Sequence, residues 1–68
     1  MSPANQDKHA ELLRQADELR AAARRARNAA AHADSSQDRI FDEQQARDYD
    51  RKAHDLESQA AALMESDP

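Results

Sequence analysis

Apolar residues recur along this chain in two stretches, each with the alternating three- and four-residue spacing that lines one face of a helix. In a seven-residue repeat abcdefg, the first stretch places these residues at a and d: His9, Leu12, Ala16, Leu19, Ala23, Ala26, Ala30 and Ala33. The second stretch does the same with Ala46, Tyr49, Ala53, Leu56, Ala60 and Leu63. All but the histidine are apolar, so the pattern predicts two helices packed along a common seam.

The two repeats are out of phase by two residues, which is about 200° around a helix at about 100° per residue. A single long helix would aim its two apolar faces in opposite directions, so the chain is expected to reverse between them. We predict an all-α fold with one helical-hairpin domain over residues 1–68. Its parts are a helix over 4–33, a turn over 34–37 and a helix over 38–65.

Capping residues mark the start of both predicted helices. Ser2 followed by Pro3 is typical of a first helical turn. Either Ser35 or Asp34, each three residues before a side chain that can return the hydrogen bond, can cap the second helix. The chain has no glycine, the residue that most readily ends a helix with left-handed backbone, and this argues against a tight turn.

An antiparallel arrangement of the two helices has a definite register. Residues whose numbers sum to 72 then face each other, and a large side chain opposes a small one in five layers: His9–Leu63, Leu12–Ala60, Ala16–Leu56, Leu19–Ala53 and Ala23–Tyr49. A sixth layer joins Ala26 and Ala46. Alternation of large and small residues lets two helices interlock without voids.

Charged residues support this register along one flank and interrupt it near the turn. Position e brings together residues of opposite charge, Arg20 with Asp50 and Arg27 with Glu43. The last two layers instead place charges on the seam, Asp42 opposite Ala30 and Arg39 opposite Ala33. The apolar seam is therefore expected to end before the turn.

Four large apolar residues lie off the seam. Ile40 and Phe41 are near the turn, and Leu13 and Met64 are near the open end of the hairpin. A two-helix hairpin of this length buries little surface, so it rarely stands alone. We predict that these four residues form a partner interface and that two antiparallel hairpins make a homodimeric four-helix bundle. In an alternative interpretation, Ile40 and Phe41 fold back over their own turn.

Composition excludes most other fold classes. The chain holds 16 alanines and five leucines but no valine, threonine, tryptophan or glycine, so strands and tight hairpins lack the residues they favour. No cysteine is present for a disulfide framework or a cysteine metal site. Charged residues make up 35% of the chain, which by itself favours disorder. The helical periodicity argues against that alternative.

Localisation is predicted from what the sequence lacks. No apolar run approaches the roughly 18 residues of a membrane span, and the segment from Met1 to Asn5 has neither the basic nor the apolar region of a signal peptide. We expect a cytoplasmic protein with no membrane partner. The abundant alanine, arginine and aspartate are typical of a high-GC bacterial source.

Arginines gather in the segment 20–33, which contains no acidic residue: Arg20, Arg24, Arg25 and Arg27, with Asn28 and His32 beside them. Guanidinium groups bind phosphates, so Arg24, Arg25 and Asn28 are candidate nucleic-acid contacts. The net charge of −4 and the lack of a neighbouring aromatic for base stacking argue against this. A small RNA- or DNA-binding regulator that uses this cluster is therefore the alternative function.

No set of catalytic, cofactor-binding or metal-binding residues emerges. Asp50, His54 and Glu57 share one helix flank, but they would need a second copy to enclose a metal ion. There is no nucleophile motif and no Gly-rich phosphate loop, and a narrow bundle is expected to offer no concave pocket. We therefore expect neither an enzyme nor a cofactor.

The predicted function is that of a small non-enzymatic interaction protein, which regulates or scaffolds an unidentified protein partner through helix–helix contacts. Contact would use Ile40 and Phe41, or the alanine flank at Ala22 and Ala29, where another helix can come close. In outline, the architecture resembles the small bacterial helical-hairpin proteins that dimerise into four-helix bundles. The resemblance covers most of the chain and assigns no functional residue.

Overall fold

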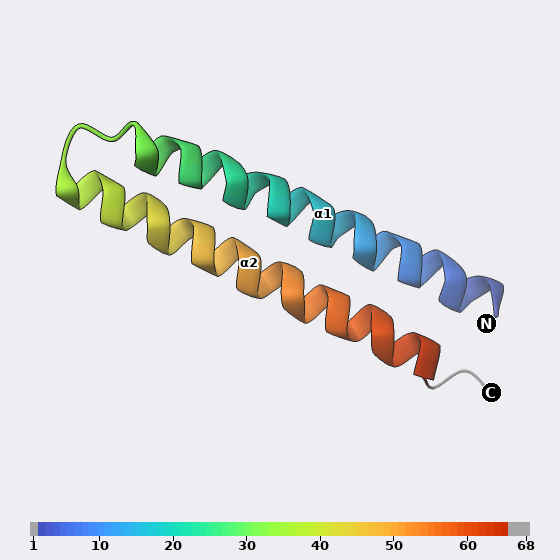
Figure 1. Ribbon diagram of the computed structural model, residues 1–68. Coiled ribbons are helices and arrows are strands. Elements are labelled where there is room, and N and C mark those ends of the chain that lie inside the picture. Colours follow the sequence, from blue (N-terminus) through green and yellow to red (C-terminus); the bar gives the residue numbers. More distant parts are fainter. Residues whose placement is uncertain (1, 66–68) are drawn as a thin grey trace.

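The computed structural model describes residues 2–65, which form two antiparallel helices lying side by side (Figure 1). Helix α1 spans Pro3–Ala31 and helix α2 spans Ser36–Glu65. The Cα atoms extend over 52 × 14 × 10 Å, so the molecule is a thin rod with a turn at one end and an open end at the other. The predicted all-helical hairpin is confirmed.

The seam between the helices is the one predicted from the repeat. Its fully buried members are Leu12, Ala16, Ala23, Ala26, Ala30, Ala46, Ala53 and Ala60. The other a and d residues of the two repeats are half-buried. Tyr49 packs against a cluster of three alanines, Ala23, Ala26 and Ala46, as the predicted layers require. Alanine methyl groups therefore make most of the core.

Serine side chains cap both helices at their N-termini. The Asn5 backbone N–H donates to Ser2 Oγ at 3.2 Å, and Pro3 occupies the first helical turn. The Asp38 backbone N–H donates to Ser35 Oγ, also at 3.2 Å. Of the two predicted caps for α2, the one that uses Ser35 is therefore present. Each bond satisfies a backbone donor that has no partner inside the helix.

The turn occupies residues 32–35, two positions earlier than the pattern predicts. Helix α1 ends at Ala31 rather than at 33, and α2 begins at Ser36 rather than at 38. Because Ser35 supplies the cap, the helical backbone begins directly after it. Residues 36 and 37, which the pattern assigns to the turn, therefore belong to α2.

Short-range hydrogen bonds close α1 without glycine. The His32 and Ala33 backbone N–H groups donate to the carbonyls of Ala29 and Ala30 at 3.2 and 3.3 Å, which tightens the last turn. His32 Nδ1 donates to the Asn28 carbonyl at 2.8 Å, because a carbonyl can only accept. No residue in the described range has positive φ, so the chain reverses with ordinary backbone throughout.

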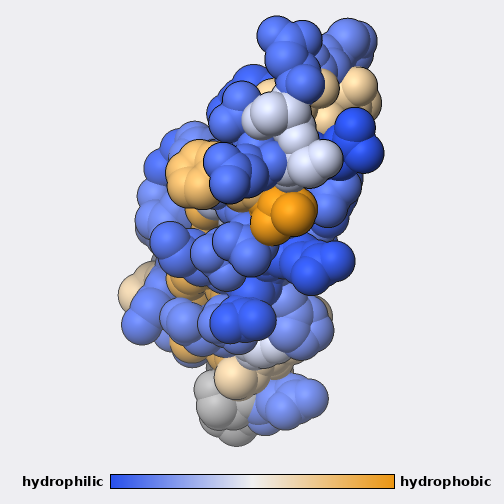
Figure 2. Space-filling view, turned by 90° about the vertical axis from the view of Figure 1, so that its left-hand side faces the viewer, coloured by the Kyte–Doolittle hydropathy of each residue, from blue (hydrophilic) through white to orange (hydrophobic). Residues whose placement is uncertain are grey.

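Hydrophilic residues cover most of the rod. Seen from the turn end, the surface is largely hydrophilic, with small hydrophobic areas between the polar side chains (Figure 2). Over residues 2–65, no polar or charged residue is fully buried. Neither helix has, in the described range, an apolar stretch long enough to span a membrane.

Candidate interaction surfaces

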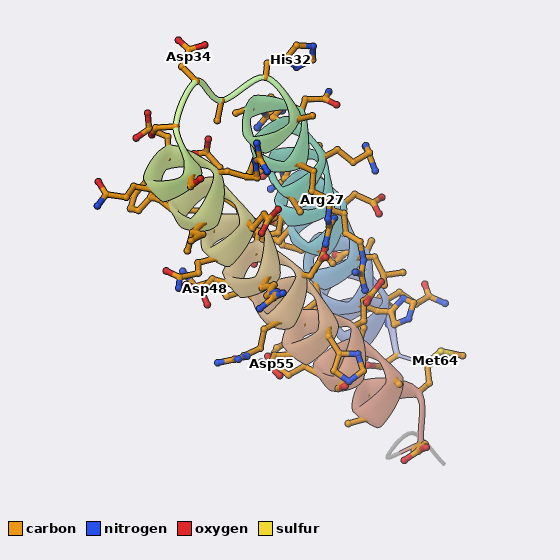
Figure 3. The ribbon with its side chains drawn as sticks, turned by 60° about the vertical axis from the view of Figure 1, so that its left-hand side comes forward. Arg27, His32, Asp34, Asp48, Asp55 and Met64 are labelled. Carbon is orange, nitrogen blue, oxygen red and sulfur yellow. The ribbon has the colours of Figure 1, made fainter. Side chains whose placement is uncertain are left out.

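Four large apolar side chains are exposed, two near each end of the rod. Ile40 and Phe41 near the turn expose 53% and 59% of their surface, and Leu13 and Met64 near the open end expose 39% and 57%. In Figure 3, Met64 lies at the end opposite His32 and Asp34, which mark the turn. The predicted interface residues are thus exposed at both ends, and Ile40 and Phe41 do not fold back to bury themselves over the turn.

An ionic ladder joins the helices along one flank. We use this name for Arg20, Arg27, Asp50 and Glu57, all at position e of the repeats. Arg20 Nη1 lies 3.3 Å from Asp50 Oδ1, and its Nη2 lies 2.6 Å from Glu57 Oε1. Arg27 Nη2 donates to Asp50 Oδ2. The ladder therefore links residues of opposite charge across the seam.

Hydrogen bonding in the ladder favours the charged form of its members. The bond from Arg27, aided by the charges of Arg27 and Arg20, lowers the pKa of Asp50 below its usual value. The bond to Glu57 is the main cause of a raised pKa at Arg20. The contacts of the ladder therefore favour an ionised Asp50 and a charged Arg20.

One predicted pair of this flank is wrong. Arg27 bonds to Asp50 rather than to Glu43, and Glu43 has no ion pair with any residue in the range 2–65. In an antiparallel pair, a position e residue lies between two such residues of the facing helix, so a long arginine can reach either. Both carboxylate oxygens of Asp50 accept from arginine, one from Arg20 and one from Arg27. The predicted pair of Arg20 with Asp50 is confirmed.

The candidate nucleic-acid contacts face solvent. Arg24, Arg25 and Asn28 are exposed at positions b, c and f, away from the seam. Neither arginine forms an ion pair within the described range, unlike Arg20 and Arg27 beside them. The backbone carbonyl of Asn28 accepts a hydrogen bond from His32 Nδ1. The cluster 20–27 therefore divides into two arginines that tie the helices together and two that have no ion pair with any residue from 2 to 65.

The remaining candidate surfaces are less distinctive. On the alanine flank, Ala22 is half-buried and Ala29 is exposed.

No group of three or more His, Asp or Glu side chains within residues 2–65 is placed to hold a metal ion. Asp50 and Glu57, which share a flank with His54, are both bonded to Arg20. These two carboxylates already neutralise a cation of the chain itself.

An open pocket of about 540 Å³ lies between the helices near the turn, so the prediction that so narrow a hairpin has no concave pocket is wrong. We call it the turn pocket. Helix α1 contributes Arg27, Ala30 and Ala31, and α2 contributes Arg39, Glu43, Ala46 and Arg47. The pocket exists because no large side chain fills the seam here: one layer joins two alanines, and in the next Ala30 faces a charged residue.

Part of the turn pocket is visible in the sequence. Arg39, Glu43 and Arg47 recur every four residues, which places them along one side of α2. The α1 alanines of the lining, Ala30 and Ala31, are not recognisable from the sequence, because they come next to these side chains only when the two helices pack.

Two kinds of surface therefore distinguish this hairpin: exposed apolar residues near both ends, and the turn pocket with its three guanidinium groups. No protein-family model matches the chain, and no curated protein or solved structure matches it significantly.

Proposed function

We propose that this chain is a non-enzymatic interaction protein that pairs with a second copy of itself into a four-helix bundle. Two hairpins lie antiparallel, so that Ile40 and Phe41 of one copy cover Leu13 and Met64 of the other. The assembled bundle then serves as a rigid scaffold or regulator for a different protein. Helix–helix contact is the only chemistry that this function requires.

The observation that carries the proposal is the mismatch between the small core and the exposed apolar residues. Seven of the eight buried core residues are alanines, and the eighth is Leu12. Burial stabilises in proportion to the apolar area removed from water, so an alanine seam contributes little for each ordered residue. The four exposed apolar side chains are larger than almost everything in the core. Covering them in a dimer adds the missing buried area.

The charges at the two ends favour the antiparallel arrangement. Near the open end, residues 2–13 and 58–65 contain three acids and one lysine, a net charge of −2. Around the turn, residues 24–47 contain five arginines and four acids, a net charge of +1. Antiparallel pairing brings each end against the opposite end of the partner, so unlike charges meet.

Sedimentation equilibrium tests the pairing directly. The wild-type chain is expected to sediment with twice its 7.6 kDa mass, and Phe41→Asp or Leu13→Asp is expected to shift it towards the monomer. Gln59→Asp is the matched control, because it adds the same charge at an exposed position of α2 that is not three or four residues from any of the four apolar residues. A folded wild-type monomer at every concentration, or an equal effect of the control, contradicts the proposal.

The surface for the different protein partner is the alanine flank at Ala22 and Ala29. Small side chains allow a further helix to approach to the low end of the usual spacing of about 8–10 Å. Pull-down with the wild type and with each variant, compared by the set of proteins captured, distinguishes the surfaces. Ala29→Asp is expected to release the partner without changing the dimer mass, whereas loss only in Phe41→Asp assigns the partner to the ends of the rod instead.

RNA or DNA binding is a second candidate function, favoured by one observation. Arg24 and Arg25 are exposed without ion pairs in the described range, although acidic residues neutralise both neighbouring arginines. Two free guanidinium groups on one helical turn can contact adjacent phosphates.

A low-salt binding assay tests this second function. If it holds, Arg24→Ala/Arg25→Ala weakens binding and flattens its dependence on salt concentration. Arg51→Ala, at an exposed position on the other helix, is the control. No binding by the wild type, or the same loss in the control, rules out this function.

A further inference from the structure

We propose that the turn pocket binds a small organic molecule with one anionic group, a carboxylate or a phosphate ester, attached to an apolar body. The anionic group accepts hydrogen bonds from the guanidinium groups of Arg39 and Arg47, and the apolar body covers the alanine surface. None of the lining residues belongs to the proposed dimer contact or to the alanine flank. This ligand class follows from the set of arginines around the pocket, which we call its rim, together with its alanine methyl groups and the carboxylate of Glu43.

The rim offers guanidinium groups whose donors are not used within the hairpin. Arg39 and Arg47 both line the pocket, and neither has an ion pair or hydrogen bond from its side chain within residues 2–65. Arg27, on the facing helix, bonds to Asp50 through one nitrogen, and its other nitrogens have no hydrogen bond to the described residues. Guanidinium groups present several donors in a rigid fork that matches the oxygens of a carboxylate or phosphate. Three of them around one concave site attract an oxyanion.

Part of the lining is apolar. Ala30, Ala31 and Ala46 contribute methyl groups from both helices. Ile40 follows Arg39 directly in the chain but is exposed rather than packed into this space. An apolar body of the ligand gains by covering the methyl groups, as in most small-molecule sites.

Glu43 limits the charge that the ligand can carry. It lies four residues from both Arg39 and Arg47 in the same pocket lining, and it has no ion pair within the described part of the chain. Arg27 is paired with Asp50. Glu43 offsets one of the two charges of Arg39 and Arg47, so one positive charge of the pocket is left to attract one anionic group. A hydroxyl or amino group of the ligand can donate a hydrogen bond to Glu43. The pocket therefore selects a molecule with a single anionic group over a polyanion.

NMR titration of the full chain with four probes tests the ligand class. Phenyl phosphate and phenylacetate combine an aromatic body with one anionic group, whereas inorganic phosphate and phenol each supply only one of these parts. We expect both combined probes to shift the amide signals of Ala30, Ala31 and Ala46, and to bind about tenfold more tightly than inorganic phosphate or phenol. The stronger of the two combined probes identifies the preferred oxyanion. Equal affinity of all four probes, or shifts elsewhere only, overturns the proposal.

Paired variants test the site itself. Arg39→Gln and Arg47→Gln are each expected to weaken phenyl phosphate binding about tenfold, because each removes a charged hydrogen-bond donor. Arg51→Gln removes the same charge at an exposed position outside the pocket and is expected to leave the affinity unchanged. A loss of equal size in Arg51→Gln shows a general charge effect and overturns the site.

A third variant fills the pocket without changing a charge. Ala31 is exposed to solvent and lines the pocket, so Ala31→Leu is expected to occlude the apolar surface and to reduce binding while circular dichroism shows an intact hairpin. Ala10→Leu, exposed at the equivalent heptad position of the same helix but outside the lining, is the control. Undiminished binding in Ala31→Leu contradicts the proposed place of the ligand.

Discussion

Arg20 and Glu57 meet across the two helices, with Nη2 of the arginine 2.6 Å from Oε1 of the glutamate, although 37 positions separate them in the chain. The same arginine also reaches Asp50. The ladder thus fixes how α1 and α2 align along their length, in addition to the seam beneath it.

A double-mutant cycle on Arg20→Gln and Glu57→Gln is expected to be non-additive. Each single change lowers the melting temperature by a few degrees, and the double variant loses less than the sum, because the second change removes a contact already broken. The comparison cycle pairs Glu57→Gln with Arg14→Gln. Arg14 bonds only within α1, to Glu11 and Glu18, so this cycle is expected to be additive. Thermal unfolding followed by circular dichroism measures both, and equal coupling in the two cycles contradicts the ladder.

Acid is expected to weaken the hairpin through Asp50. Its pKa is lower in the folded protein than in the unfolded chain, where an aspartate titrates near pH 4. The unfolded state therefore binds more protons in this range. The contribution of Asp50 to stability is complete above about pH 4 and disappears as the pH falls through the folded pKa.

Urea unfolding between pH 2 and pH 6 checks this dependence, since Asp50→Asn is expected to flatten it. Asp48→Asn removes a nearby carboxylate that is exposed and outside the ladder (Figure 3), and it is expected to leave most of the slope in place. If both variants have the slope of the wild type, the ladder does not set the response to acid.

A larger residue in the alanine seam is expected to destabilise the hairpin. Ala23 is fully buried and packs with Tyr49, so Ala23→Leu forces the helices apart at a cost of about 1–3 kcal/mol. Ala10→Leu places the same side chain at an exposed position of α1 and is expected to have little effect. Chemical denaturation of both variants provides the measurement, and equal stability of the two would disprove close packing at this layer.

Loss of the second cap is expected to cost stability at the turn. Ser35→Ala removes the oxygen that accepts from the Asp38 backbone N–H, at a cost of about 1 kcal/mol. Ser36→Ala, one residue further on and inside α2, serves as the control. Hydrogen exchange of the Asp38 amide reports the change locally, and unchanged protection in Ser35→Ala would rule out the cap.

Much of the fold follows from local spacing and from residue size. The a and d residues identify the buried face of each helix, and the alternation of large and small residues identifies which of them meet. Tyr49 packs against the alanine cluster that contains Ala23, as that reasoning requires. Ser35 is recognisable as one of two caps from its place before a helix-forming run. The cap and the buried faces are predictable because they depend on residues close together in the chain. The facing pairs are predictable because both helices have regular geometry.

The choice of ion-pair partners and the existence of the turn pocket depend on the packed pair. A heptad position places the backbone of Arg27 between Asp50 and Glu43, but the rotamer of a long side chain decides which acid it reaches. The turn pocket requires small residues on both helices at the same height, and its volume depends on the distance between them.

The sequence by itself determined two helices, their buried faces and their antiparallel register, because these follow from periodicity and side-chain volume. Only the tertiary structure decided which charges pair and where a hollow is left, because these depend on how flexible side chains settle around a fixed helix separation.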